Sequence, residues 1–169
     1  MHNIQSHPSL FVQVALMNEA FGNPKGDPAS IDWARVQKQA SNIAGDHPGD
    51  EYGELMRAIA AKDADATRDA FGDIIVFALG GFHFLGADGD DDVTEVLRAV
   101  MTRFCRDRAH LADTVQHYTE RGVKVFCGGE FPRAWVKSEV DQVGSDGERY
   151  AQGKFLKALG YEQPKLKPL

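Results

Sequence analysis

The sequence predicts a mainly α-helical fold, a helical bundle that carries a small β-hairpin near its C-terminus. Apolar residues recur at helical spacing over residues 9–121, and loops rich in Pro, Gly and Asp separate these stretches. The pattern then alternates over residues 123–127 and again over residues 134–138, with two glycines between them. We therefore expect a helical core over residues 1–122. The hairpin and tail, residues 123–169, are expected to pack on this core or on a neighbouring subunit.

Six helices are expected, because Ser, Asp or Pro begins each stretch and Gly commonly ends it. The fourth helix is apolar nearly all round after Asp73, so we place it at the centre of the bundle. The ADGDDD run at 87–92 lacks the register of a calcium loop and is expected to be a solvated, helix-capping loop. The expected helices begin at Ser6 or Ser9, Ser30 or Asp32, Pro48 or Gly49, Asp63 or Asp65, Asp92 and Asp107, and end near residues 21, 43, 62, 85, 106 and 121.

Composition narrows the class of protein. The net charge of −6 argues against nucleic-acid binding through a basic surface, but not against a nucleotide held through a metal ion. No apolar stretch reaches the roughly 20 residues of a membrane span, and the N-terminus lacks the pattern of a signal peptide. Cys105 and Cys127 form no zinc pattern. We expect a cytoplasmic protein with free thiols and no membrane or nucleic-acid partner.

Two acidic clusters lie on the third and fourth expected helices. Glu51 and Glu54 are three residues apart, Asp50 and Glu54 four, and Asp69 and Asp73 four, so each cluster lies on one helix face. Antiparallel packing of the two helices would turn the clusters toward each other. Carboxylates that converge without a cation form a site for a hard divalent ion, in the first place Mg²⁺. The alternative is a solvated acidic face.

Two glycines inside the same helices strengthen the first interpretation. Gly53 and Gly72 directly precede Glu54 and Asp73. A glycine in the middle of a helix costs roughly 1 kcal/mol relative to alanine. We interpret these glycines as marks of close helix–helix approach or of access for a ligand.

This acidic segment resembles the MazG-like all-α nucleotide pyrophosphohydrolases, a superfamily that includes phosphoribosyl-ATP pyrophosphohydrolase and the dimeric dUTPases. Glu51-x-x-Glu54, a spacer and the D-A-F-G-D run at 69–73 are similar to the family motifs E-x-x-E and E-x-x-D. Similar family segments follow one another along most of the chain: F-G-N-P at 21–24, the glycine-bounded run at 80–86, residues 95–104, G-K-F-L-K at 153–157 and P-K-L at 164–166. The resemblance implies an all-α NTP pyrophosphatase-type bundle.

The sequence departs from the family pattern at several positions. Ala70 stands where the second motif usually has its first glutamate, and Asp69 is one residue away. Val100 and Arg103 replace the usual asparagine and lysine. The AGDHPG run at 44–49 interrupts the helix that leads into the first motif. These departures leave one metal ligand and some substrate contacts open.

The resemblance implies hydrolysis of the α–β phosphoanhydride bond of a nucleoside triphosphate, which gives the monophosphate and pyrophosphate. The catalytic residues would be Glu51, Glu54 and Asp73. These three carboxylates, with Asp69 or Asp50, would hold Mg²⁺, for which Mn²⁺ can substitute. One of the carboxylates would orient or deprotonate the attacking water.

Substrate contacts are expected on other helices and in the tail. The family takes phosphate contacts from the fifth helix, where Arg103 is the first candidate, followed by Arg98 and by Lys154 in the tail. Aromatic and amide side chains are expected to recognise the base, because aromatics stack on bases and amides bond their edges. These candidates are Trp33, Phe11, Phe21 and the segment around Asn18.

Other readings stay open. The compact, diverged form resembles phage-encoded members of the family, which would act in the host cytoplasm, and MazZ-type (d)GTP pyrophosphohydrolases are one such group. The alternatives are a non-catalytic module of the same fold that binds nucleotide or a partner, and phosphoribosyl-ATP pyrophosphohydrolase. The family also implies a homo-oligomer, a tetramer or a dimer, with substrate bound near the subunit interface.

Overall fold

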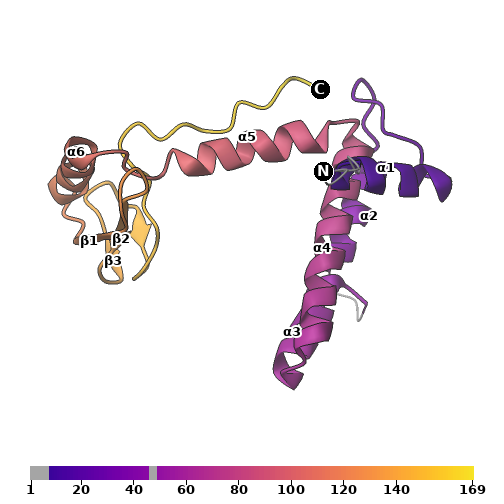
Figure 1. Cartoon of the computed structure of the whole chain (residues 1–169), viewed down its shortest axis with the longest axis horizontal. Coiled ribbons are helices and arrows are strands. Elements are labelled where there is room, and N and C mark those ends of the chain that lie inside the picture. Colours follow the sequence, from indigo (N-terminus) through magenta and orange to yellow (C-terminus); the bar gives the residue numbers. More distant parts are fainter. Residues whose placement is uncertain (1–7, 46–48) are drawn as a thin grey trace, which may run out of the picture. The chain divides into compact units, whose positions relative to one another are not determined.

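The computed structural model describes residues 8–45 and 49–169, and this part of the chain is mainly helical, as the sequence predicts (Figure 1). Its helices are α1 (Leu10–Ala20), α2 (Trp33–Ile43), α3 (Glu51–Ala61), α4 (Ala64–Leu85), α5 (Gly89–Met101) and α6 (Arg108–Glu120). Its strands are β1 (Val125–Gly128), β2 (Trp135–Ser138), β3 (Gln142–Val143) and β4 (Arg149–Tyr150).

The chain divides into two compact units, and the boundary differs from the expected one. The first unit extends to Val93 and includes Lys167–Leu169, whereas Thr94–Leu166 form the second. The expected core over residues 1–122 included α6, but α6 packs on β1 and β2. Leu111 and Val115 of α6 contact the apolar cluster that the hairpin covers, so this helix belongs with the strands.

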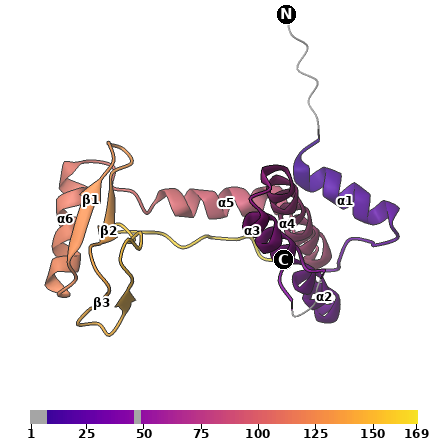
Figure 2. The same cartoon turned by 90° about the horizontal axis from the view of Figure 1, so that it is seen from below.

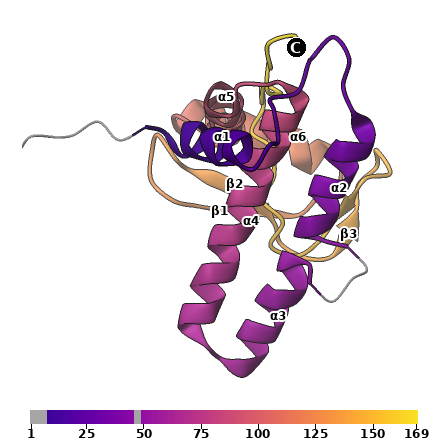
Figure 3. The same ribbon diagram turned by 90° about the vertical axis from the view of Figure 1, so that its right-hand side faces the viewer.

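In the first unit α1, α2 and α3 all pack on α4, so the prediction that this helix is central is confirmed (Figure 2). Figure 3 shows α3 and α4 as an antiparallel pair, joined by a tight turn in which Lys62 is left-handed with φ of 55°. Capping explains the helix starts: the side chains of Ser9, Asp32, Asp50 and Asp63 each accept a backbone N–H of the following turn. The alternative starts Ser6 and Pro48 lie outside the described residues.

The two glycines of the acidic helices do not mark close helix–helix approach. A Cβ added at Gly72 would meet nothing within 4 Å. A Cβ added at Gly53 would meet Asp50 and Arg57 of its own helix. The close-approach interpretation is therefore wrong for both positions, and access for a ligand remains.

A loop after α1 is locked onto the C-terminal end of α4. The buried His83 ring donates from Nε2 to the Asn23 carbonyl (2.9 Å), and Gly26 N–H donates to the His83 carbonyl (2.9 Å). A Cβ at Gly26 would lie 1.9 Å from the Phe84 carbonyl oxygen, and a Cβ at Gly86 would lie 2.6 Å from the Gly26 oxygen. Only glycine permits this contact, which fixes the position of the loop.

Helix α5 begins and ends earlier than expected. The side chain of Asp88 accepts the N–H groups of Asp90 and Asp91, so the acidic run caps the helix and Gly89 is its first residue. After Met101 the backbone turns with bonds to carbonyls three residues back, and the Thr102 hydroxyl also binds the Ala99 carbonyl (2.7 Å). The expected end near residue 106 was therefore too late.

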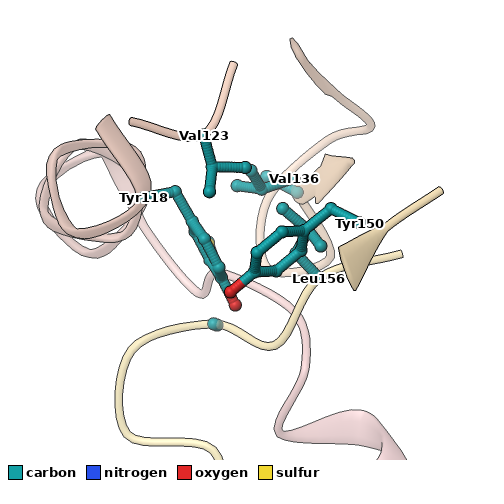
Figure 4. Packing of buried hydrophobic residues seen from close by; sticks show 8 residues of the cluster. Tyr118, Val123, Val136, Tyr150 and Leu156 are labelled. Carbon is teal, nitrogen blue, oxygen red and sulfur yellow. The ribbon is translucent and has the colours of Figure 1, made fainter. Parts of the chain in front are cut away.

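The second unit encloses a small core between α6 and the strands (Figure 4). Tyr118, Val123, Val136, Tyr150 and Leu156 meet there, and the two tyrosine rings contact edge to face at 6.0 Å. β1 pairs antiparallel with β2, and β3 with β4, so the predicted hairpin is confirmed and a second short one follows it.

Two further features bear on the expected class. Both cysteines are free; the buried Cys105 thiol donates to Thr114 Oγ1 (3.6 Å), and Cys127 is exposed. Within the described ranges, no single helix is long and apolar enough to cross a membrane, and only α4 and α5 taken together, across the break between them, meet that test.

Candidate functional site

Glu51 is the side chain on which the acidic residues of α3 and α4 converge. It shares one face of α3 with Leu55 and Ala58, which are buried. Its Oε2 atom is buried without a hydrogen-bond partner in the described part of the chain. Burial raises the pKa of Glu51 above its ordinary value of 4.5. Four neighbouring carboxylates raise it further, namely Asp73, Glu54, Asp50 and Asp69 in order of decreasing effect.

The structure thus brings the five predicted carboxylates close enough together to interact, but their other contacts differ. Asp50 is the N-cap of α3 and accepts the N–H groups of Gly53 and Gly45 (3.3 Å). Glu54 lies 3.9 Å from a nitrogen of Arg57. Because Asp50 already holds the start of its helix, it is the least available of the five to a ligand.

A hollow of about 460 Å³ lies beside the carboxylates, between α3 and α4. Alanines from both helices line it, among them Ala58 and Ala70, which is only 4% exposed. Glu54 and Asp69 line the same hollow. Asp69 therefore places a carboxylate beside Ala70, whose own side chain is small.

The donor chemistry fits a hard divalent cation, although the side chains are not closed around one. Oxygen ligands suit Mg²⁺ and Mn²⁺, and the buried Oε2 of Glu51 has no hydrogen-bond partner among the described residues. Across residues 8–45 and 49–169, no three acidic, histidine or cysteine side chains lie close enough to hold one ion as they stand. Glu51, Glu54 and Asp73 would have to turn toward a common point.

A pocket of about 380 Å³ lies in the same unit, where α1, α2 and α4 meet. We call it the α1–α2–α4 pocket, and its volume is within the roughly 300–1,000 Å³ of small-molecule sites. It combines an apolar wall with several polar groups. The wall includes Val76, Phe77 and Phe84 of α4, and the polar groups include Asn18, Arg35, Lys38, Gln39 and Asn42.

Four of these polar residues lie outside the set predicted from the sequence. Arg35, Lys38, Gln39 and Asn42 follow the spacing i, i+3, i+4 and i+7, so they share one face of α2. That spacing is the signal that identifies them. It resembles an ordinary solvated face in the sequence, and only the packing of α2 on α4 turns it into the wall of a pocket.

Arg35 is held firmly, and one of its donors is buried without a partner in the described part of the chain. Its Nη1 donates to the Pro24 carbonyl (2.9 Å), and its guanidinium carbon lies 3.8 Å from the centre of the Phe84 ring. Its Nη2 is buried and has no partner among the described residues. An arginine only donates hydrogen bonds, so this nitrogen is an unsatisfied buried donor, which an acceptor could pair only by reaching it below the surface.

The carboxylates and the pocket share one face of α4. Asp69, Asp73, Phe77, Gly80 and Phe84 recur every three or four residues, which keeps them on one side of the helix. Asp73 and Gly80 are about 10 Å apart along the helix axis. This face therefore joins an acidic end to a pocket that has polar and aromatic groups.

The residues predicted to contact phosphate belong to the second unit, and their contacts there are unequal. Arg98 donates to both oxygens of Glu95 (2.7 and 2.8 Å) and to Glu162 (3.2 Å), which gives it a structural role. Lys154 donates to the Arg149 carbonyl (3.2 Å).

Arg103 differs from these two residues. Its Nε is buried without a partner in the described ranges, and its guanidinium carbon lies 5.5 Å from the Tyr161 ring centre. Of the three predicted phosphate ligands, Arg103 is thus the one with a buried, unpaired donor within the described ranges.

The structure also places the residues predicted to recognise the base in different surroundings. Asn18 and Phe21 line the α1–α2–α4 pocket. Phe11 is buried and packs against Gly89, where a Cβ would lie 2.6 Å from its ring. Trp33 begins α2 and is 66% exposed. Two of the four candidates thus lie at the pocket.

Comparisons with protein families, with curated proteins and with solved structures find no match to this chain.

Proposed function

We propose that the chain is a metal-dependent nucleoside triphosphate pyrophosphohydrolase, which converts a (d)NTP and water into the (d)NMP and pyrophosphate. The observation that carries this proposal is Glu51, a partly buried carboxylate with an unpaired oxygen and a pKa raised by four other carboxylates. Such a concentration of negative charge is unfavourable unless a cation neutralises it. A pocket suited to an organic group lies on the same face of α4.

Glu51, Glu54 and Asp73 would hold Mg²⁺ or Mn²⁺, with Asp69 as a further ligand. When bound, the ion supplies charge neutralisation for the phosphates and a lowered pKa for the attacking water. One of these carboxylates would accept the proton of that water, and Glu51 is the first candidate because its pKa is raised. Without the ion the carboxylates would repel a triphosphate, so turnover requires metal.

The shared face of α4 would set the orientation of the bound substrate. The base would lie in the α1–α2–α4 pocket, and the phosphates would extend along the helix toward Asp73. Lys38 at the pocket is exposed and cationic, which suits a position near the phosphates.

We also propose that the chain forms a homo-oligomer through an exposed apolar face of α3 and α4. The side chains of this face are between 46% and 54% exposed, and they are Tyr52, Met56, Ile59, Phe71 and Ile75. Their spacing of three or four residues places them in one stripe on each helix. Exposed apolar stripes of this kind are candidates for interaction sites in soluble proteins.

The test of the activity is product analysis with a panel of ribo- and deoxyribonucleoside triphosphates, with and without Mg²⁺ or Mn²⁺. Metal-dependent release of monophosphate and pyrophosphate in equal amounts is the expected result. Asp73→Asn should abolish it. The matched control is Asp65→Asn on the same helix, where the carboxylate is 92% exposed and pairs only with Arg68 among the residues the structure describes.

The outcome that would overturn this proposal is the absence of turnover on every triphosphate in the presence of metal. If the folded chain nevertheless bound nucleotides, that result would favour the non-catalytic module. Equal loss of activity in Asp73→Asn and Asp65→Asn would point to a general electrostatic effect and would contradict the assignment of Asp73 as a ligand.

A further inference from the structure

The strands of the second unit have one face on its core and one face turned away from it. Residues opposite each other in an antiparallel pair share a face, and neighbours along a strand alternate between the two faces. Val136 points into the core (Figure 4), so Trp135 and Lys137, its neighbours in β2, point away from the core. Phe126 of β1 pairs with Lys137 and therefore shares that side. We call this side the outer face of the hairpin.

A third segment continues the outer face beyond β2. Leu156 N–H donates to the Val136 carbonyl (2.9 Å), and Phe155 forms a bridge with Lys137. Leu156 is buried in the core, so its neighbours along the chain lie on the outer face. The side chains of this face are Lys124, Phe126, Trp135, Lys137, Glu139, Phe155 and Lys157.

Three aromatic rings lie on the outer face, and the ring of Phe104 adjoins it. Phe126 and Trp135 contact edge to face, with their ring centres 5.4 Å apart. Phe155 contacts Phe104, with ring centres 5.1 Å apart. None of the four is in the core cluster, and Phe126 is 41% exposed. Formation of the core therefore does not explain these rings, and exposed rings of this kind suit a ligand that stacks.

Two glycines allow the Trp135 indole to lie against the main chain. A Cβ at Gly128 would lie 2.3 Å from Cζ2 of the indole, and a Cβ at Gly129 would lie 2.9 Å from its Cδ1. The indole therefore extends over the backbone of both glycines. The Lys137 ammonium lies 4.5 Å from the centre of the same ring. Because a lysine stem is flexible, a planar ligand can displace the ammonium from the ring and keep it as a neighbour.

The outer face is also positively charged. It carries three lysines and one glutamate, and no ion pair in the described ranges involves Lys124, Lys137 or Lys157. The net charge of −6 is unevenly divided along the chain. Residues 94–166 hold 12 Lys and Arg against 10 Asp and Glu, whereas the rest of the chain holds 7 against 15. The negative charge that argues against a nucleic-acid partner therefore belongs to the first unit.

We propose that the outer face of the hairpin binds single-stranded nucleic acid. Bases would stack on Trp135, Phe126 and Phe155, because every base has a flat aromatic face. Lys124, Lys137 and Lys157 would contact the phosphates between those bases. A duplex keeps its bases stacked inside and cannot use the rings, and a neutral sugar would leave the lysines without a role. This second function does not depend on the proposed hydrolysis of triphosphates.

The experiment measures the fluorescence anisotropy of labelled (dT)20 and (rU)20 as the full chain is added in EDTA. We expect both single strands to bind, and the duplex of (dT)20 with (dA)20 to bind at least about tenfold more weakly. Three neutralised phosphates on a single strand give a slope of about −2 in log Kobs against log salt concentration. The affinity should accordingly fall about 20-fold between 50 and 200 mM salt.

Two substitutions on the outer face test the two kinds of contact, and both lie outside the core. Phe126→Ala should weaken binding at least about fivefold, as expected for the loss of one stacked base. Lys137→Gln should weaken binding and make the salt slope shallower by about 0.7. The matched controls are Val143→Ala, which shortens an apolar side chain that is 62% exposed on β3, and Lys25→Gln in the first unit. Both controls should bind like the native chain, and circular dichroism verifies that all four variants fold.

The absence of binding to either single strand at 50 mM salt would overturn the proposal. If Phe126→Ala then lowered the molar mass measured by light scattering, a second copy of the chain would be the partner of this face. Equal affinity for single strand and duplex would also overturn the proposal, as would native affinity in both Phe126→Ala and Lys137→Gln.

The test is separate from the test of the pyrophosphohydrolase. Asp73→Asn should bind the oligonucleotides like the native chain, and a loss of binding in that variant would move the nucleic acid to the carboxylates and refute the outer face. Oligonucleotide binding by a chain that hydrolyses no triphosphate would refute the enzyme alone. Hydrolysis without oligonucleotide binding would refute the outer face alone.

Discussion

Removal of one charge at Glu51 should stabilise the metal-free protein. Glu51→Gln eliminates the repulsion from Glu54 on the same helix, about 0.2–0.5 kcal/mol. It also relieves the burial of an unpaired charged oxygen, and an unsatisfied buried group costs roughly 1–3 kcal/mol. Glu51 is partly exposed, so water screens the charge, and the new amide also needs partners. We expect a net gain of about 1 kcal/mol.

The assay is thermal unfolding in EDTA and again in excess Mg²⁺. For a chain of this length, a gain of about 1 kcal/mol corresponds to a rise in Tm of roughly 2–4 °C in EDTA. Magnesium at a hundred times its Kd should stabilise the native chain by about 2.7 kcal/mol. Glu51→Gln should lose most of this second effect. The order of the two Tm values therefore reverses when metal is added.

The pH dependence gives an independent test with a definite sign. The pKa of Glu51 is raised in the folded state, so above 4.5 the folded chain holds a proton that the unfolded chain has already released. The contribution of Glu51 to the free energy of unfolding must then fall as the pH rises from 4.5 through the raised pKa. The advantage of Glu51→Gln in EDTA should accordingly be absent below pH 4.5 and grow above it. A Glu51→Gln chain that is less stable than the native one at pH 7 in EDTA would refute this reasoning.

Three further outcomes can be checked with the same material. Asp69→Ala should lower metal-dependent turnover, and unchanged turnover would show that Asp69 does not replace the glutamate absent at Ala70. Ile75→Ser should lower the molar mass measured by light scattering, whereas Val12→Ser, equally apolar and 41% exposed on α1, should leave it unchanged. The pKa of Glu95 is lowered to about 2 by its hydrogen bonds from Arg98 and Lys165, so its contribution to stability is present above pH 4.5 and lost as the pH falls toward 2. Glu95→Gln should therefore flatten the acid limb of a stability profile.

The helices were predictable because each has a local signal. Asp32 and Asp63 cap the helices that follow them, and both were among the predicted starts. Helix α5 was harder, because apolar residues such as Phe104 continue the helical spacing after Met101. The helix ends there because Cys105 pairs with Ala134, a contact between residues far apart in sequence that no local pattern reports.

The carboxylate cluster and the α1–α2–α4 pocket also differ in whether a local pattern reports them. The carboxylates share helix faces at fixed spacing, so Glu51 and Asp73 could be grouped from the sequence. The pocket depends instead on how α2 meets α4, and the polar face with Arg35 and Gln39 resembles a solvated surface until that packing is known. The raised pKa of Glu51 likewise requires burial, which the sequence does not specify.

The loop after α1 holds one end of the α1–α2–α4 pocket in place, although no large core surrounds it. His83 holds Asn23, Gly26 and Gly86 allow the backbones to touch, and the same loop presents the Pro24 carbonyl to Arg35. A fully buried histidine in an apolar helix therefore positions an arginine that it does not contact directly. Rigid placement of a donor limits which acceptors it can bind, because a mobile arginine would adapt to any acceptor. The glycines and the histidine at this end of α4 thus shape the α1–α2–α4 pocket. Asp69 and Asp73 at the other end instead contribute negative charge to the carboxylate cluster around Glu51.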